Sequence, residues 1–148
     1  MEFCRISNYR DLSGSGGQRV EGRWHSKGRA VVYLADHASS ALLEQLVHLD
    51  PEEAPSTYQL LRVEVPDNVP IDEVDRSALP PDWRDQQDIT RRIGDEWLIR
   101  GASALLRVPS ALSPRASNFL LNPACAAASE IRIAEVVVAP FDPRFWKR

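Results

Sequence analysis

A short apolar run over residues 30–35, AVVYLA, constrains the fold of this chain more than any other stretch. It is rich in β-branched residues and is flanked by turn residues, a pattern typical of a buried strand. Side chains alternate between the two faces of a strand, so Val31 and Tyr33 share one face. Val32 and Leu34 share the other face. We therefore expect this strand to lie in the core of the fold.

A helix is predicted directly after this strand. Asp36 or Ser39 can cap its N-terminus, and the apolar spacing extends it to about residue 49. Its expected core-facing residues are Leu42, Leu43, Leu46, Val47 and Leu49. Glu44 and His48 lie about one helical turn apart beside this stripe, where they can form a pair.

Further patterns predict the other elements. Apolar runs favour strands over residues 2–7, 58–66, 105–108 and 131–138, and helical spacing favours a helix over 88–102. Residues 26–28 (SKG) predict a turn with a positive φ at Gly28. Residues 13–17 (SGSGG) fit a phosphate-binding loop or a glycine-rich surface turn. Because no regular βαβ rhythm is present, we predict one α+β domain over residues 1–148.

Composition argues against several classes of protein. The 148 residues are 43% hydrophobic and 26% charged, ordinary values for a globular domain. The net charge of −3 and pI near 5.6 argue against direct DNA or RNA binding. Basic residues nevertheless gather near the N-terminus, where they would attract phosphate-bearing substrates: Arg5, Arg10, Arg19, Arg23, Lys27 and Arg29.

The sequence carries no membrane, export or metal signal. No apolar run reaches the roughly 18 to 20 residues of a membrane span, and the N-terminus lacks the apolar core of a signal peptide. We therefore expect a cytoplasmic protein. Cys4 and Cys125 are isolated, so reduced thiols are expected, and the histidines and cysteines lack zinc-ligand spacing. We expect no metal and no cofactor.

Three different chemistries lie close together around the buried strand. Arg23 is a fixed cation, Tyr33 offers an aromatic face with a hydroxyl, and Glu44 is a carboxylate. A pocket for an anionic, ring-bearing substrate that develops positive charge on a sugar would need this set. Spacing alone favours a solvated Glu44 paired with His48 and a core tyrosine, and it also fits Arg23 stacked on Trp24.

Several motifs occur in a fixed order from residue 4 to residue 144: CRIS, LSGSGG, GRWHSKG, VVYLA, LLEQLVHL, LRVEVPD, GDEWL, LRVPSAL, NFLLNP and FDPR. In this combination the chain resembles the RES-domain family, toxins of bacterial toxin–antitoxin pairs. The resemblance implies a mixed-sheet fold similar to the ADP-ribosyltransferase and diphtheria-toxin core, and an enzyme that uses NAD as its substrate. It also implies a cognate antitoxin of the Xre type that covers the active site.

The resemblance also implies which residues form the site. Arg23, Tyr33 and Glu44 match the family's arginine, tyrosine and glutamate positions, and Ser110 matches its serine. Asn118 and Arg5 are further candidates for the same NAD pocket. Family members often have a histidine shortly after the Asn-Pro pair, where this chain has Cys125, so that histidine's role has no counterpart here.

The implied reaction breaks the nicotinamide–ribose bond through an oxocarbenium-like state. We expect Glu44 to accept a hydrogen bond from the ribose hydroxyl next to the breaking bond. Arg23 would pair with the pyrophosphate. Tyr33 would stack on nicotinamide, and Ser110 would bond its amide or the ribose.

Several alternatives stay open at this point. The acceptor of the ADP-ribose is water, phosphate or a protein side chain, so either NAD depletion or ADP-ribosylation of a protein target fits. A ribonuclease toxin using His25 and His48, or a non-catalytic domain binding through its aromatic tail, are the other interpretations. The sequence does not decide whether the chain forms a homodimer.

Overall fold

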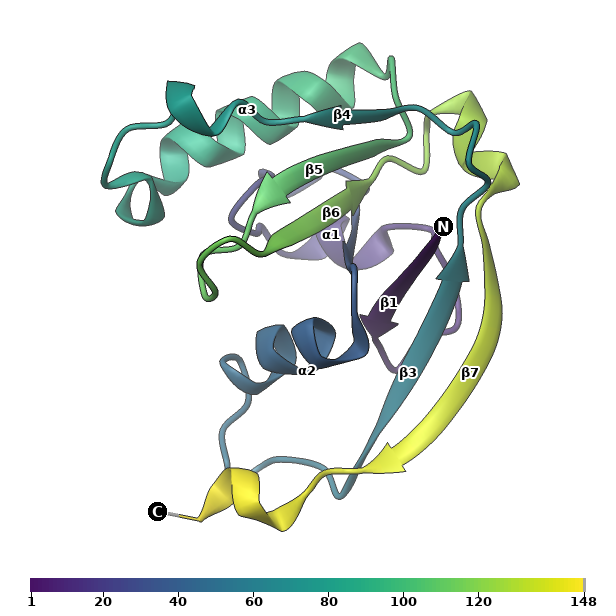
Figure 1. The fold of residues 1–148 in the computed structure, drawn as a ribbon, viewed down its shortest axis with the longest axis vertical. Helices are drawn as coiled ribbons and strands as arrows, with labels where there is room; N and C mark the ends of the chain where they lie inside the picture. The colour runs from purple at the N-terminus through teal and green to yellow at the C-terminus, as the bar shows by residue number, and fades with distance from the viewer. Residues whose placement is uncertain (148) are drawn as a thin grey trace.

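Seven strands form one mixed sheet in the computed structural model, which describes residues 1–147 (Figure 1). Their order across the sheet is β4-β5-β6-β2-β1-β3-β7. Only β4 and β5 are parallel neighbours; the other pairs are antiparallel. The strands are β1 Glu2–Ile6, β2 Val32–Ala35, β3 Thr57–Glu64, β4 Ile71–Glu73, β5 Leu105–Pro109, β6 Ser117–Leu121 and β7 Arg132–Pro140. The α+β prediction is confirmed, and the apolar run forms β2 in the middle of the sheet.

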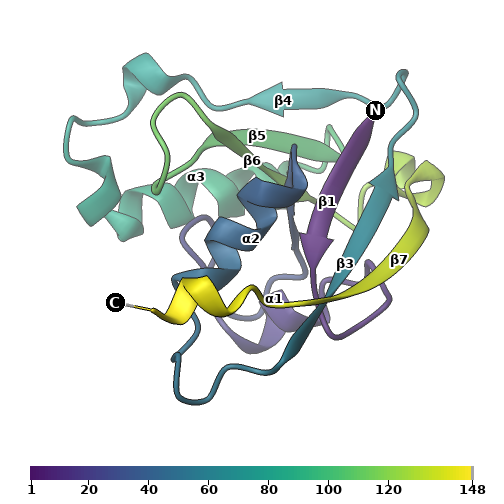
Figure 2. The same cartoon turned by 60° about the horizontal axis from the view of Figure 1, so that its bottom comes forward.

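Three α-helices accompany the sheet: α1 Ser15–Arg19, α2 Ala38–Leu46 and α3 Gln87–Arg100. Short 3-10 helices cover Arg76–Ala78, Trp83–Asp85, Ala126–Glu130 and Pro143–Trp146. In Figure 1, β4, β5 and β6 run across the top beside α3, while β1, β3 and β7 run obliquely at the lower right. Helix α2 packs on β1 and β2, and Figure 2 shows it in front of the sheet. None of the helices in residues 1–147 is long and apolar enough to cross a membrane.

Two apolar clusters occupy the two faces of the sheet. Val32 and Leu34 belong to the first cluster, with Phe3, Val63, Val65, Val69, Ala104, Leu105, Phe119, Leu121 and Ile131. Val31 belongs to the second, and Tyr33 packs against it, with Trp24, Val74, Trp83, Trp97, Leu98, Leu106, Val108 and Leu120. The predicted alternation of β2 is therefore confirmed. Burial on both faces keeps this central strand in register.

Helix α2 differs from its prediction. His37, rather than Asp36 or Ser39, is the N-cap: its side chain accepts a hydrogen bond from the backbone N–H of Ser39. The helix ends at Leu46, and Ala41 is its buried residue. The predicted core stripe is wrong at Leu43 and Val47, which are 41% and 52% exposed. Its other members are half-buried: Leu42, Leu46 and Leu49.

The glycine-rich segment also differs from its prediction. Gly14 has a positive φ of 75° and precedes α1, so residues 13–17 are partly helical rather than a flexible loop. A β-carbon at Gly14 would lie 2.6 Å from the backbone nitrogen of Val31, so the segment packs tightly against the start of β2. The predicted turn at Gly28 is confirmed by its φ of 97°.

Helix α3 supports the loop that precedes β2. The Thr90 hydroxyl is buried and donates to the carbonyl of Arg23 at 2.5 Å. The guanidinium of the next residue, Arg91, donates to the carbonyl of Gly22 at 2.8 Å. Buried backbone carbonyls need hydrogen-bond donors, and side chains of α3 supply these donors to the loop.

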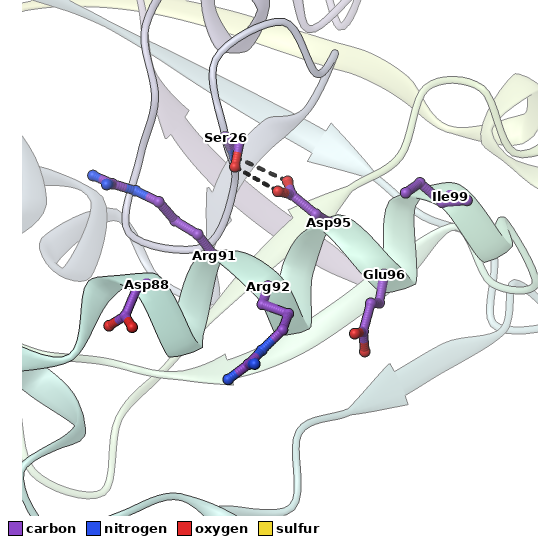
Figure 3. A pocket seen from close by; sticks show the side chains of 7 residues that line it. All are labelled: Ser26, Asp88, Arg91, Arg92, Asp95, Glu96 and Ile99. Atoms are coloured by element: carbon purple, nitrogen blue, oxygen red, sulfur yellow. Dashed lines mark hydrogen bonds between the residues drawn. The ribbon is translucent and has the colours of Figure 1, made fainter.

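The next turn of α3 continues this support. Asp95 accepts from both the backbone N–H and the hydroxyl of Ser26, at 2.9 and 2.5 Å, as Figure 3 shows. Gly94 lies between these contacts, and a β-carbon there would be 1.6 Å from the carbonyl oxygen of Trp24. The loop therefore lies directly on the backbone of α3, which is possible only because residue 94 is glycine.

We predict that Gly94→Ala destabilises the fold by about 3 kcal/mol, because the added methyl group overlaps the Trp24 carbonyl. Gly16→Ala is the matched control, since nothing lies within 4 Å of a β-carbon there. Its effect should stay within about 1 kcal/mol. Urea unfolding of both variants measures the difference, and equal midpoints would contradict the close contact.

Candidate active site

Glu44 of α2 is the centre of a polar cluster formed by three elements. The amide nitrogen of Asn118, on β6, donates to Glu44 Oε1 at 2.7 Å. The Ser110 hydroxyl, directly after β5, lies 3.4 Å from the same oxygen. Three of the predicted residues, far apart in sequence, are thus brought into contact. Both recorded bonds use Oε1, and Oε2 has no hydrogen bond to any residue from 1 to 147.

The loop after β5 fixes the Ser110 hydroxyl. It accepts from the backbone N–H groups of Leu112 and Ser113 at 3.2 and 3.1 Å. A hydroxyl has one hydrogen and two lone pairs, so its hydrogen is left for Glu44. Ser110 is 5% exposed, so the position of its hydroxyl is fixed by contacts within the protein rather than by solvent.

The alternative pairing of Glu44 with His48 does not occur. Helix α2 ends before His48, which is exposed, and the structure records no hydrogen bond or ion pair between these two side chains. Glu44 is instead half-buried against the β5–β6 hairpin. Spacing along a presumed longer helix led to the alternative, and the earlier helix end removes it.

Tyr33 lies on the sheet face that carries Asn118. In the β2–β6 register Ala35 is opposite Asn118, and Tyr33 is two residues from Ala35, so Tyr33 and Asn118 are diagonal neighbours on one face. The Tyr33 hydroxyl lies 3.2 Å from the backbone nitrogen of Trp24 and 2.8 Å from His25 Nδ1. Tyr33 therefore points its ring along the same face as the cluster, with its hydroxyl toward the loop.

Arg23 joins this region through a second arginine. Its guanidinium donates to the carbonyl of Arg84 at 2.7 Å and lies 5.8 Å from the ring of Trp83. Arg84 lies 4.7 Å from that ring and donates to the carbonyl of Ala111 at 3.1 Å. Two hydrogen bonds thus connect Arg23 to the residue after Ser110. The cation–π contact predicted with Trp24 is made with Trp83.

Arg5 is not brought to the cluster. Cys4 is opposite Ala35 in the sheet, so the next residue of β1 points to the other face. The Arg5 guanidinium donates to the carbonyl of Asp11 at 2.9 Å. Burial lowers the pKa of this guanidinium.

A surface pocket of about 420 Å³ lies along the outer side of α3 (Figure 3). It contains none of the predicted site residues; its lining is Ser26, Asp88, Arg91, Arg92, Asp95, Glu96 and Ile99. Two of these, Arg91 and Asp95, already bond the supporting loop. Residues 1–147 hold no group of three His, Cys, Asp or Glu side chains arranged for a metal ion.

Sequence reasoning missed two residues of this region, Trp83 and Arg84. They lie between β4 and α3, where no motif was singled out, although the aromatic–arginine pair was a usable signal. His25 is 2% exposed and contacts Tyr33, which no periodicity indicates. Contacts of this kind come from the tertiary fold.

The mixed sheet, the α3-supported loop and the clamped glutamate belong to an α+β domain, whose fold is consistent with the ADP-ribosyltransferase fold. The RES domain matches residues 3–142, and the chain belongs to the RES domain family. A chain of the crystal structure of the M. tuberculosis MbcT–MbcA toxin–antitoxin complex has the same fold, with a TM-score of 0.69. The match covers 98% of this chain and 86% of that one at 18% identity.

Curated relatives give the same family. "Toxin Res" of Pseudomonas putida is 50% identical over 83% of this chain and 85% of its own length. "Toxin Res" of Photorhabdus laumondii is 42% identical over 75% of this chain and 72% of its own length. "Prs ADP-ribosylating toxin" of a Sphingobium species is 34% identical over 93% and 88% of the two chains. The predicted family resemblance is therefore confirmed.

Burial raises the pKa of the Tyr33 phenol well above its ordinary value near 10. The unfolded chain loses this proton near pH 10 while the folded chain keeps it, so the free energy of unfolding should fall as pH rises above about 10. Phenolate absorbance measures the ionisation directly. Tyr33→Phe should therefore leave the alkaline absorbance change of the native protein unchanged. A smaller absorbance change in this variant would contradict the burial of Tyr33.

Proposed function

We propose that this chain is the toxin of a toxin–antitoxin pair and cleaves the nicotinamide–ribose bond of NAD. The observation that carries the proposal is the Glu44 carboxylate: Asn118 and Ser110 hold one oxygen, and the other is left for a ligand. The names of the relatives support it, because three of those at 39–50% identity are called "Toxin Res" and another is called an ADP-ribosylating toxin.

A Glu44 carboxylate held in this way is suited to cleavage of the nicotinamide–ribose bond. The C1′–nitrogen bond breaks, nicotinamide leaves as a neutral molecule with the bonding electrons, and positive charge develops on the ribose. Glu44 Oε2 would accept a hydrogen bond from the adjacent ribose hydroxyl and stabilise that charge. Asn118 and Ser110 fix the carboxylate beforehand, so little reorganisation is needed when the charge appears.

The two arginines near Trp83 supply the positive charge for the other end of the substrate. Arg23 uses one recorded hydrogen bond, to the Arg84 carbonyl, and the remaining N–H groups of its guanidinium suit a pyrophosphate. Arg84 is exposed beside it. Tyr33 would present its ring to nicotinamide on the face shared with Asn118.

Transfer to a protein target is the second candidate function. The name of the Sphingobium relative favours it, since that protein is called an ADP-ribosylating toxin. Water, phosphate or a protein side chain would form the new bond to C1′ and release a proton. The three acceptors yield ADP-ribose, its phosphate or a modified protein, so product analysis separates them.

A partner of the Xre antitoxin type fits the same site. The structural neighbour comes from a toxin–antitoxin complex. Leu43 of α2 and Val47, directly after the helix, are exposed and would give an antitoxin apolar contacts near the carboxylate in sequence. Covering this helix would close the site.

The positions of the two candidate histidines argue against a ribonuclease. His25 is buried against backbone carbonyls, whereas His48 is exposed beyond the end of α2. Acid–base cleavage of RNA needs two groups that reach one phosphodiester. These two side chains do not offer that arrangement.

Glu44→Ala should reduce nicotinamide release from NAD by roughly 100-fold or more, because the group that stabilises the oxocarbenium-like state is lost. The exposed Glu52 is the matched control, and Glu52→Ala should keep wild-type activity. The assay is run with and without phosphate, and the co-product identifies the acceptor. Full activity in a folded Glu44→Ala variant would refute the role of this carboxylate.

Arg23→Ala should weaken NAD binding roughly tenfold or more, since charge-assisted hydrogen bonds to the pyrophosphate are lost. Isothermal titration calorimetry with NAD measures the affinity. Both arginine variants are made in a chain that also carries Glu44→Ala, so that NAD is not consumed during the titration. Arg92→Ala, an exposed arginine on α3, controls for the change in net charge. Equal affinities of the Arg23 and Arg92 variants would rule out the pyrophosphate assignment.

A further inference from the structure

We propose that His25 is a positioning residue, which binds the Tyr33 hydroxyl so that only the ring of Tyr33 faces the substrate. The inference rests on the proposed function for its kinetic consequences and on the hydrogen-bond geometry for its structural part. It assigns a role to a buried histidine that the reaction itself does not use.

The hydrogen-bond partners of His25 fix its tautomer. Nε2 lies 3.0 Å from the carbonyl oxygen of Gly17 and 2.9 Å from that of Val20. Carbonyl oxygens only accept, so Nε2 carries a hydrogen. His25 is 2% exposed, and the salt bridges among residues 1–147 do not include it. The neutral ring therefore has Nδ1 as an acceptor.

The tautomer in turn determines how the Tyr33 hydroxyl is used. Nδ1 accepts, so the Tyr33 hydroxyl donates its one hydrogen across the 2.8 Å contact. The backbone N–H of Trp24 donates to the same oxygen at 3.2 Å. With its hydrogen given to His25, the hydroxyl has none left for a substrate.

Packing around the hydroxyl leads to the same conclusion. A β-carbon on Gly22 would lie 2.5 Å from the Tyr33 oxygen and 2.9 Å from the His25 ring. The chain thus closes over this oxygen, and Gly22 is the residue that permits it. Tyr33 as a whole remains half-buried, so its accessible part is the aromatic ring. His25 also links this tyrosine to α1, through the carbonyls of Gly17 and Val20.

Steady-state kinetics of nicotinamide release tests the consequence. Tyr33→Ala removes the ring and should lower kcat/KM roughly 100-fold. His25→Leu and Tyr33→Phe each remove the same hydrogen bond while the ring stays, so both should raise the KM for NAD by similar, smaller factors. His25→Asn, whose side-chain oxygen can take the place of Nδ1, should restore most of that loss. His48→Leu is the exposed control and should be neutral.

Nuclear magnetic resonance of the imidazole nitrogens tests the geometry without any activity. We expect His25 to show the Nε2–H tautomer, and a hydrogen on Nδ1 would overturn the inference. Tyr33→Phe losing as much activity as Tyr33→Ala would also overturn it, because the hydroxyl would then act on the substrate. A wild-type chain that released no nicotinamide would count against the proposed function instead, and the tautomer would still decide the role of His25.

Discussion

The site depends on how α3 satisfies the backbone of the loop over residues 22–26. Within residues 1–147 that loop pairs with none of the strands of the sheet, and its own bridge joins Gly22 to His25. Its remaining backbone polar groups must therefore be bonded elsewhere. Thr90, Arg91 and Asp95 supply those bonds along one side of the helix. Unpaired buried groups would each cost about 1–3 kcal/mol, so the loop has one favourable arrangement on this helix. Arg23 takes its position from that arrangement.

The polar cluster around Glu44 has a different origin. It is formed where the β5–β6 hairpin meets α2, and each contributor is fixed by its own local structure. Asn118 is placed by the register of β6 with β2 and β5, and Ser110 by two backbone N–H groups of the hairpin loop. The carboxylate is thus held by a sheet and a hairpin loop, and Arg84 links that loop to the α3-supported segment.

Sequence patterns predicted those helices and strands whose apolar residues are buried in the fold. The apolar β2, the alternating β3 and the amphipathic α3 all appear at the expected places, because the number and spacing of apolar residues determine whether they are buried. Helix α2 was predicted too long, since apolar spacing alone does not mark where a helix ends, and residues 47 and 48 form a turn. Strand β4 was missed, because its pairing with β5 is a tertiary contact that three residues cannot signal. The motifs of the family indicated Glu44, Ser110 and Asn118 as candidates, but not that they touch. The link through Arg84 and the histidine behind Tyr33 required the fold.

Helix α2 carries the carboxylate and packs on β1 and β2. Ala41 is its buried residue, Leu42 and Leu46 are half-buried, and Glu44 adds hydrogen bonds to Asn118 and Ser110. The hydrogen bonds of Glu44 to Asn118 and Ser110 therefore place the carboxylate and join the helix to the β5–β6 hairpin at the same time. Replacing Glu44 would consequently remove a link between two parts of the fold as well as a charge.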